Sequence, residues 1–283
     1  MPSGGPKHQV CVVHLVWKPL GLDVFAAFLE SYRGRSAGLE HELAVLVKGF
    51  SSERELGPFA DLLEGTPHHL VTVADDGFDI RPYFTAAQML PYRYCCFLNS
   101  YSRIAGDDWL VKLHAELTRP GVGVVGATGS HESPVEGHRR AVAGAPSPRS
   151  LRGLTTRFRT GRFVRRLERD FEPFPNPHIR TNGFMIERET MLSLRFDGEE
   201  DKLDSLRFES GKHGMTRQIL GRGLRVLVVG REGRAYEPEK WAESRTFRSA
   251  EQENLLIADN RTDEYADGDD ETRAFLRELA WGR

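Results

Sequence analysis

The stretch that decides the fold is Tyr94-Cys95-Cys96-Phe97-Leu98-Asn99-Ser100-Tyr101-Ser102. Its first five residues are an apolar run too short for a helix, which predicts a strand buried on both faces of a parallel sheet. Polar side chains follow at once, and Gly106-Asp107-Asp108-Trp109-Leu110 then predicts a helix start with an acidic cap. Open α/β sheets bind ligands where a buried strand passes into such a loop. The candidate ligand-binding residues here are Asn99, Ser100, Tyr101 and Ser102. The alternative is an ordinary polar loop.

Strand and helix patterns alternate on both sides of that stretch. Upstream, we expect strands at 9–17, 41–50 and 69–73, and helices at 22–32, 53–63 and 80–90, the last broken near Pro82. Downstream, we expect a helix at 109–117 and a strand at 122–127. This order predicts an α/β fold, a Rossmann-like mostly parallel sheet with helices on both faces.

The composition changes after Ser130. Residues 131–177 are rich in arginine, interleaved with Leu and Phe. One interpretation is a basic lid over an anionic ligand or a contact with an anionic membrane surface, and the other is a solvated helical insertion. A strand is expected within 178–188, followed by a helix from about Glu189. A loop leading into a helix is expected at 208–220, a last strand at 225–229 and a closing helix at 271–281.

Bulk properties exclude some classes of function. The chain has 39 basic and 41 acidic residues and a net charge of −2, so no global field favours nucleic acid. The three cysteines are expected to be buried thiols in a reducing compartment. The first nine residues lack a signal-peptide pattern, and no apolar run approaches the roughly 20 residues of a membrane span. We therefore expect a cytoplasmic protein, with peripheral membrane contact through 131–177 as a variant of that expectation.

Over residues 9 to about 230, this layout resembles a GT-A fold glycosyltransferase of the family 2 type. The matching segments are Val16-Trp17-Lys18-Pro19 after the first strand, Asp75-Asp76 after the third, Asp108-Trp109-Leu110, Pro120 to Gly126, and Asn182 to Arg188. The resemblance implies one domain over 1–283. Its parts are a nucleotide-binding half at 9–130, the Arg-rich insertion at 131–177, an acceptor-side half at 178–230, and a C-terminal flap and helix at 231–283.

The family's fourth strand ends in an Asp-x-Asp motif that binds a divalent metal on the donor diphosphate. Here Asn99 and Tyr101 fill those positions, so the motif is degenerate. A neutral amide is a poor ligand for a hard cation, because charged oxygens supply much of the affinity. Mg²⁺ or Mn²⁺ dependence is therefore uncertain, and we expect it to be weak or absent. Asp107 and Asp108 are substitute carboxylates, although helix capping is their more ordinary role.

The resemblance and the residue types together give a set of candidate site residues. Glu209 matches the acidic residue that opens the acceptor-side helix in inverting members, which makes it the candidate base; a helix N-terminal carboxylate is the alternative. His213 is an alternative base, a late metal ligand or a surface histidine. Candidate nucleotide-sugar-binding residues are Val16, Trp17, Lys18, Lys48, Asp75, Asp76, Asn99, Ser100, Tyr101, Ser102, Thr181 and Asn182. Tyr236, Trp241, Ser244 and Thr246 are expected in the flap.

The leading hypothesis is a glycosyltransferase that moves a sugar from a nucleotide-sugar donor to a saccharide, lipid-linked or small-molecule acceptor, as in polysaccharide biosynthesis. One alternative is a sugar-nucleotide nucleotidyltransferase, although Lys18-Pro19-Leu20-Gly21 is too poor in glycine to cradle a triphosphate. The other is a non-catalytic nucleotide-sugar-binding protein on the same fold, which the missing aspartates make plausible.

Overall fold

The computed structural model describes residues 8–143, 163–198 and 201–282. Its strands are β1 Val10–Trp17, β2 Glu42–Lys48, β3 His69–Thr72, β4 Tyr94–Leu98, β5 Arg103–Ile104, β6 Val122–Gly126, β7 Gly129–Ser130, β8 His178–Ile179, β9 Gly183–Glu187, β10 Arg225–Val229, β11 Ala235–Tyr236 and β12 Ile257–Ala258. Its α-helices are α1 Leu22–Gly34, α2 Glu53–Leu62, α3 Ile80–Met89, α4 Trp109–Leu117, α5 Pro134–Ala143, α7 Arg188–Leu192, α8 Lys202–Ser210, α9 Met215–Leu220, α10 Asn260–Ala266 and α11 Asp270–Trp281. Two 3₁₀ helices, η1 Lys18–Leu20 and η2 Pro238–Ser244, complete the fold.

One eight-stranded sheet organises the molecule, in the order β11-β10-β6-β9-β4-β1-β2-β3. β9 is antiparallel to both β4 and β6, and β11 is antiparallel to β10. The other strands run in one direction, because β1 pairs in parallel with β2 and β4, β2 with β3, and β6 with β10. The predicted α/β fold with a mostly parallel sheet is therefore confirmed.

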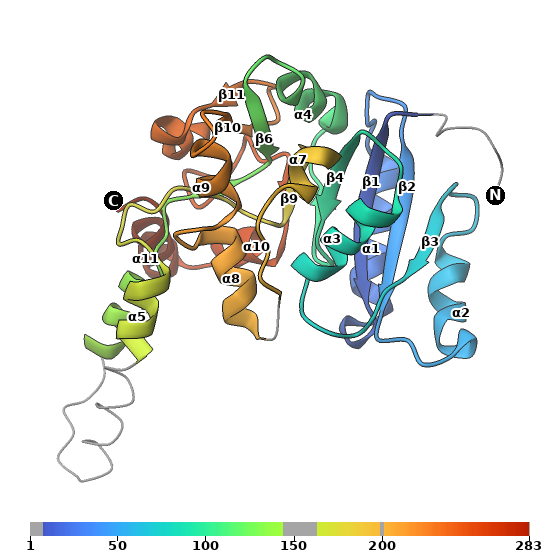
Figure 1. The fold of residues 1–283 in the computed structure, drawn as a ribbon, viewed down its shortest axis with the longest axis horizontal. Coiled ribbons are helices and arrows are strands. Elements are labelled where there is room, and N and C mark those ends of the chain that lie inside the picture. The colour runs from blue at the N-terminus through green and yellow to red at the C-terminus, as the bar shows by residue number, and fades with distance from the viewer. Residues whose placement is uncertain (1–7, 144–162, 199–200, 283) are drawn as a thin grey trace, which may run out of the picture.

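The sheet divides the interior into two cores, because successive side chains of a strand point to opposite faces. In β1, Cys11, Val13 and Leu15 join the core under α3, α7 and α9. Val10, Val12 and Val16 join the core under α1, α2 and α4. Figure 1 shows α1 and α3 on opposite faces of the sheet, α2 beside β3, and α5 projecting at the far end. Helices thus cover both faces, as predicted.

Two local predictions were wrong. Pro82 does not break α3, because it lies in the first turn, where the missing N–H has no intrahelical partner to lose. Asp108 occupies the N-cap position of α4 with a φ of 55°, but its side chain does not cap the helix. Instead, Ser36 donates its backbone N–H to Asp107 and its hydroxyl to Asp108, each at 3.2 Å. The two aspartates therefore anchor the loop that follows α1.

The residues that flank 131–177 form a two-stranded ladder that is separate from the main sheet. β7 and β8 pair antiparallel, with Gly129 opposite Ile179 and Ser130 opposite His178. The described ends of this excursion pack on α8 through a small cluster of Val135, Leu167 and Phe171. Arg149, Arg152, Arg157, Arg159 and Arg162, on which the lid and membrane hypotheses depend, lie outside the described residues.

The cysteine prediction holds within the sheet. Cys11, Cys95 and Cys96 are buried free thiols. Burial raises the pKa of the Cys95 thiol to about 12, so it stays protonated at neutral pH.

Candidate functional site

The parallel strands end along one edge of the sheet, and β9 starts at that same edge because it runs the opposite way. The register places Leu98 at the end of β4 opposite Gly183 at the start of β9. Residues that follow β4 and β6 therefore lie next to residues that precede β9, and residues at the ends of β1, β2 and β3 lie farther along the same edge. Most of the predicted site residues lie along this edge, where open α/β sheets bind ligands.

At one end of this edge, Trp17, Lys48 and Asp75 form what we call the tryptophan cluster. The Trp17 indole donates to Asp75 Oδ1 at 3.2 Å, and Lys48 Nζ lies 3.8 Å from the same oxygen. Lys48 is buried and also donates to the carbonyl of Phe78 at 3.0 Å, which fixes the turn after β3. Gly49 has a φ of 80°, and a Cβ there would lie 3.2 Å from Asp75, so the backbone must pass close to that carboxylate. The result is an indole, 39% exposed, held beside a fixed carboxylate.

Three other residues predicted for this end have different roles. The Val16 side chain is buried in the core, so only its backbone reaches the edge. Lys18 Nζ pairs with Glu55 at 2.6 Å, and Asp76 lies 3.7 Å from Arg81. The structure does not bring these three side chains into the tryptophan cluster.

The loop Asn99–Ser102 after β4 is held by hydrogen bonds among its own residues. Asn99 Oδ1 accepts from the Tyr101 backbone N–H and from the Ser102 hydroxyl, both at 3.0 Å. The Ser102 hydroxyl also contacts the carbonyl of Asn182. Ser100 and Ser102 are buried, whereas Tyr101 is 37% exposed. Tyr101 is therefore the member of this loop that offers its ring to a ligand.

This geometry does not fit the divalent metal that the family resemblance implies. The single amide oxygen of Asn99 already accepts two hydrogen bonds from its own loop, and a phenol replaces the second carboxylate. Within residues 8–143, 163–198 and 201–282, no group of three or more His, Cys, Asp or Glu side chains is placed to hold a metal ion. We therefore derive no step through a metal.

Asn182 links the loop to a buried polar network. Its Oδ1 accepts from the Thr128 hydroxyl at 2.7 Å, which leaves Nδ2 as the remaining polar atom of the amide. That Nδ2 is buried and has no hydrogen-bond partner among the described residues. A buried donor without a partner is costly, so an acceptor that reached Nδ2, such as a ligand oxygen, would be bound favourably.

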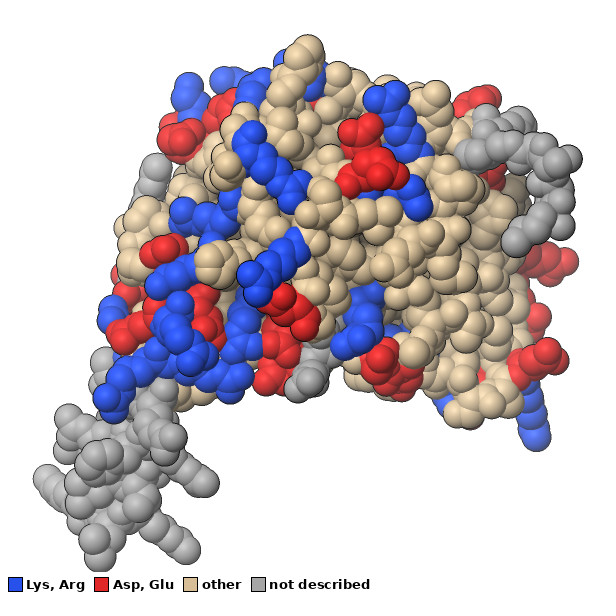
Figure 2. Space-filling model, viewed as in Figure 1, with Lys and Arg blue, Asp and Glu red and all other residues tan. Residues whose placement is uncertain are grey.

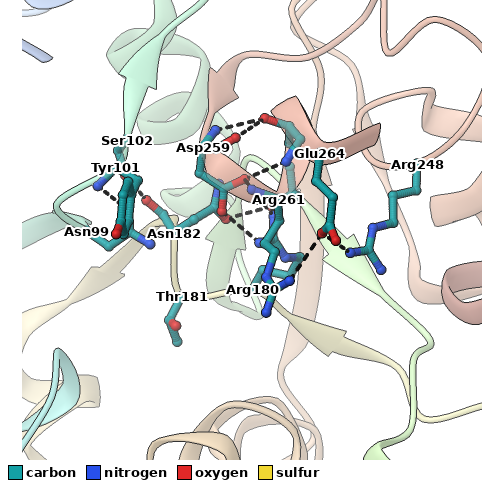
Figure 3. Close-up of polar contacts among 12 residues, drawn as sticks. Asn99, Tyr101, Ser102, Arg180, Thr181, Asn182, Arg248, Asp259, Arg261 and Glu264 are labelled. Atoms are coloured by element: carbon teal, nitrogen blue, oxygen red, sulfur yellow. Dashed lines mark hydrogen bonds and ion pairs between the residues drawn. The ribbon is translucent and has the colours of Figure 1, made fainter. Parts of the chain in front are cut away.

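The centre of that network, the arginine network, is an ion pair between Arg180 and Asp259. Arg180 Nη2 lies 2.7 Å from Asp259 Oδ2, and the two side chains are 10% and 1% exposed. Figure 3 shows the two facing each other beside Asn182. Burial alone would lower the pKa of Arg180, but Asp259 outweighs it and the pKa is raised. The guanidinium therefore stays charged inside the protein.

The Phe247 ring lies within reach of two arginines. Arg180 lies 4.2 Å from the ring centroid and Arg248 lies 4.9 Å from it. Arg248 in turn pairs with Glu132 at 3.1 Å. It also pairs with Glu264 at 3.2 Å (Figure 3). Burial lowers the pKa of Arg248, which the two glutamates oppose. These contacts tie the C-terminal part of the chain to the start of the excursion.

Glu209 faces the same region, but from a different helix position than expected. It lies in the last turn of α8, so the idea that it opens a helix was wrong, and the helix dipole does not favour it there. Its Oε2 accepts from the backbone N–H of Thr181 at 3.2 Å and from the Thr181 hydroxyl. Its Oε1 lies 3.8 Å from Nε2 of His178. Thr181, the residue before Asn182, thus holds Glu209 beside Asn182.

The remaining predicted residues do not join the site. The His213 side chain is exposed in the turn between α8 and α9, and it makes no hydrogen bond or ion pair in the described part of the chain. Tyr236, Trp241, Ser244 and Thr246 are buried rather than presented as a surface flap. Arg103 of β5 pairs with Asp263 at 2.6 Å.

Sequence reasoning missed Thr128, His178, Arg180 and Asp259. A local signal existed for Asp259, because Asp259 and Thr262 form a capping box at the start of α10. Nothing local shows that this cap also meets Arg180, 79 positions away.

Comparisons with known proteins give likenesses of fold only. No protein-family model matches the chain, and no curated protein matches it. Among solved structures, it is similar to the mannosyltransferase PcManGT from Pyrobaculum calidifontis in complex with GDP-Man and Mn²⁺, with 14% identity, a TM-score of 0.47 and coverage of 87% of this chain. The match spans 61% of that mannosyltransferase chain.

Two further likenesses are weaker. A 4-diphosphocytidyl-2C-methyl-D-erythritol synthase from Anaerococcus prevotii DSM 20548 has 11% identity and a TM-score of 0.44, over 78% of this chain and 86% of that one. The glucosyl-3-phosphoglycerate synthase from Mycobacterium tuberculosis has 15% identity and a TM-score of 0.34, over 65% and 57%. Likenesses of this size carry no argument about function, which must come from the site.

The surface and the helices bear on membrane contact. Figure 2 shows basic side chains gathered beside the excursion, mixed with acidic ones. Several are paired there, such as Arg207 with Asp170 at 2.8 Å and Arg169 with Asp170 at 2.8 Å. Among the helices that the structure describes, none is long and apolar enough to cross a membrane.

Proposed function

We propose that this protein is a GT-A type glycosyltransferase that transfers a sugar from a nucleotide-sugar to an acceptor hydroxyl. The proposal rests on the side chains that lie along one edge of the sheet. At one end it holds an exposed indole fixed beside a carboxylate, and farther along it holds a half-buried carboxylate beside an unpaired amide donor. The first pair suits a nucleoside, and the second suits an attacking hydroxyl and its leaving group.

In this proposal, the tryptophan cluster binds the nucleoside. The Trp17 ring offers a stacking face to the base, and stacking of a base on an aromatic ring contributes about 1–3 kcal/mol. Asp75 accepts a hydrogen bond from the base or ribose. Lys48 holds the turn beneath them, so the carboxylate is fixed before the ligand arrives.

The chemical step takes place at the start of β9. The acceptor hydroxyl attacks the anomeric carbon, the bond to the diphosphate breaks, and Glu209 Oε1 takes the hydroxyl proton. Oε2 is already engaged by Thr181, which leaves Oε1 as the basic atom. Asn182 Nδ2 donates to an oxygen of the departing diphosphate or of the sugar. A base on the acceptor is what an inverting reaction requires.

We also propose roles for the parts of the chain and a class of acceptor. Residues 1–283 form one catalytic domain, in which 9–130 bind the donor and 178–230 face the acceptor. The acceptor is a saccharide, a lipid-linked sugar or a small molecule, and a lipid-linked one would use the excursion as its membrane contact. The nucleotidyltransferase alternative is less well supported, because Lys18 is bound to Glu55 and η1 replaces a glycine-rich phosphate loop.

A thermal-shift panel of UDP, GDP, CDP, ADP and dTDP tests the proposal. A nucleotide at 100 times its Kd stabilises the protein by about 2.7 kcal/mol, which is a clear rise in Tm. We expect one nucleotide to raise the Tm of the wild type and to lose most of that effect in Trp17→Ala. Phe275→Ala is the control, because Phe275 is exposed on α11 away from the tryptophan cluster. A panel in which no nucleotide raises the Tm would contradict the proposal.

A further inference from the structure

Beside Glu209 lies a buried histidine, His178, whose hydrogen bonds determine where its proton sits. His178 is 5% exposed, and its Nδ1 lies 2.8 Å from the carbonyl oxygen of Asn176. A carbonyl oxygen only accepts, so Nδ1 must carry a proton and donate it. In the neutral ring, Nε2 is then left with a lone pair.

That lone pair faces a carboxylate oxygen. Nε2 lies 3.8 Å from Glu209 Oε1, which is too far for a direct hydrogen bond, and an ionised carboxylate also only accepts. With the ring neutral and the carboxylate ionised, two acceptors face each other across this gap. The other oxygen of Glu209 is saturated by the two Thr181 donors, so it cannot take that proton without losing a contact.

We propose that His178 and Glu209 act as one proton-accepting pair for the attacking hydroxyl, an inference that rests on the proposed glycosyl transfer. When the acceptor oxygen bonds to the anomeric carbon and the diphosphate leaves with its bonding electrons, the hydroxyl proton passes to Glu209 Oε1. His178 Nε2 then shares that proton. Glu209 is the catalytic residue, and His178 is a positioning residue that acts through it.

The charges around the pair are consistent with this division of roles. Arg180 lies between β8 and β9 and interacts electrostatically with Glu209. Asp259, at the start of α10, pairs with Arg180 and balances its charge. Arg180 thus places a positive charge near this carboxylate without pairing to it directly. His178 is fixed in the β7–β8 ladder, where its backbone lies opposite Ser130, so its ring is placed before any ligand binds.

His178→Asn is the test variant. The shorter amide retains a donor for the Asn176 carbonyl but has no nitrogen in the place of Nε2. His68→Asn is the matched control, because His68 Nδ1 also contacts the carbonyl two residues before it, Thr66, at 2.8 Å, on an exposed site next to α2. The readout is release of nucleotide diphosphate, with water as acceptor, from the glucose and mannose conjugates of the nucleotide that raises the Tm in the panel. Nucleotide Kd and Tm are measured in parallel.

We expect His178→Asn to lower kcat by about 10²-fold, the lower end of the range for proton-transfer groups, with nucleotide Kd within about twofold of wild type. His68→Asn should match the wild type. In the Glu209→Gln background, His178→Asn should cost almost nothing more, because residues that act as a unit are not additive. A merely structural histidine would instead add its loss in both backgrounds. Should the asparagine variant melt early, His178→Gln is the second variant, because its longer amide can occupy the place of Nε2 without being basic.

The other outcomes would contradict either the His178–Glu209 pair or the proposed glycosyl transfer. Full turnover in His178→Asn, or equal additional losses in both backgrounds, overturns the pair and leaves glycosyl transfer standing. A wild type that binds nucleotide but releases no diphosphate overturns the pair and favours a non-catalytic binder. A wild type that binds no nucleotide overturns the proposed function itself, and the pair with it.

Discussion

The tryptophan cluster and the arginine network lie along the same edge of the sheet but are built in different ways. Trp17 and Lys48 are the last residues of the parallel strands β1 and β2, and Asp75 follows their neighbour β3 by three residues. Two of the three are exposed. Arg180 and Asp259 are buried and come from distant parts of the chain. An exposed cluster can be altered at little cost to folding, whereas a buried charge pair cannot.

Removing the buried partner of Arg180 should therefore have the largest effect on stability. Asp259→Ala leaves an uncompensated buried cation, and breaking such a pair typically costs about 3–5 kcal/mol. Urea unfolding measures the loss. Asp269→Ala is the matched control, because Asp269 also caps a helix, by accepting from Thr272 N at 2.8 Å, but is exposed and meets no buried arginine. Equal losses in the two variants would show that capping, and not the ion pair, is the larger contribution.

Glu209→Gln should separate catalysis from stability at the junction of the two regions. The amide keeps the shape of the side chain but removes its basicity, so kcat should fall by about 10²–10⁴ while nucleotide affinity stays near wild type. Donor turnover and Tm are measured on the same preparation. Unchanged turnover per folded molecule, with or without a lower Tm, would indicate a retaining reaction or a binder without catalysis.

His14 offers the opposite case to the arginine network, a buried polar side chain without a partner. Both ring nitrogens lack hydrogen bonds among the described residues, and the ring stacks 3.5 Å from Phe28. His14→Leu should stabilise the protein by about 1–3 kcal/mol, since it removes an unsatisfied group. His41→Leu is the comparison, because His41 is bonded to Tyr32 and to Leu39 and should lose stability instead.

The same histidine predicts acid lability. Burial lowers the pKa of His14 from 6.5 to about 3. Between these values the unfolded chain binds a proton that the folded protein does not, so stability falls as the pH falls below 6.5. At pH 5 the loss is about 2 kcal/mol. Unfolding at pH 7 and pH 5 should show this loss in the wild type, and a similar loss in His14→Leu would assign it to other groups.

Changing Asp75 should affect binding much more than folding. Asp75→Asn keeps an acceptor for the Trp17 indole but removes the charge, and the site is 53% exposed. We expect Tm to change little and nucleotide Kd to rise roughly fivefold, as for loss of about 1 kcal/mol from a charged hydrogen bond. Calorimetric titration with the nucleotide found in the panel measures it. An unchanged Kd would remove Asp75 from the nucleoside site.

The smallest expected effect is that of metal removal. Because the Asn99 amide oxygen is engaged within its own loop, EDTA should leave nucleotide affinity within about twofold of its starting value. Binding that disappears in EDTA and returns with Mg²⁺ or Mn²⁺ would show that this reasoning is wrong and would direct attention to Asp107, Asp108 and His213.

The sequence predicted the two regions unequally for a physical reason. The tryptophan cluster depends on strand ends, and strand ends can be read from apolar runs followed by polar residues, as for Trp17 and Asp75. The arginine network depends on how the segment after residue 231 packs on the rest of the protein. That segment contains the 3₁₀ helix η2, the short strand β12 and the helix α10. The polarity of that segment suggested a flap, but Trp241 and Tyr265 are buried. Nothing in the local pattern reveals that Asp259 faces Arg180.

The antiparallel ladder between β7 and β8 makes the excursion an exchangeable module. Its two ends are joined by paired backbone, and the Asn176 N–H donates to the His131 carbonyl at 2.9 Å just beyond the ladder. The entropy of closing a loop rises only slowly with its length, so a segment held at its base can lengthen, shorten or change composition at little cost to the domain. His178 belongs to that base and not to the segment itself. A change of length within the excursion is therefore expected to leave this ladder, and the position of His178 in it, unchanged.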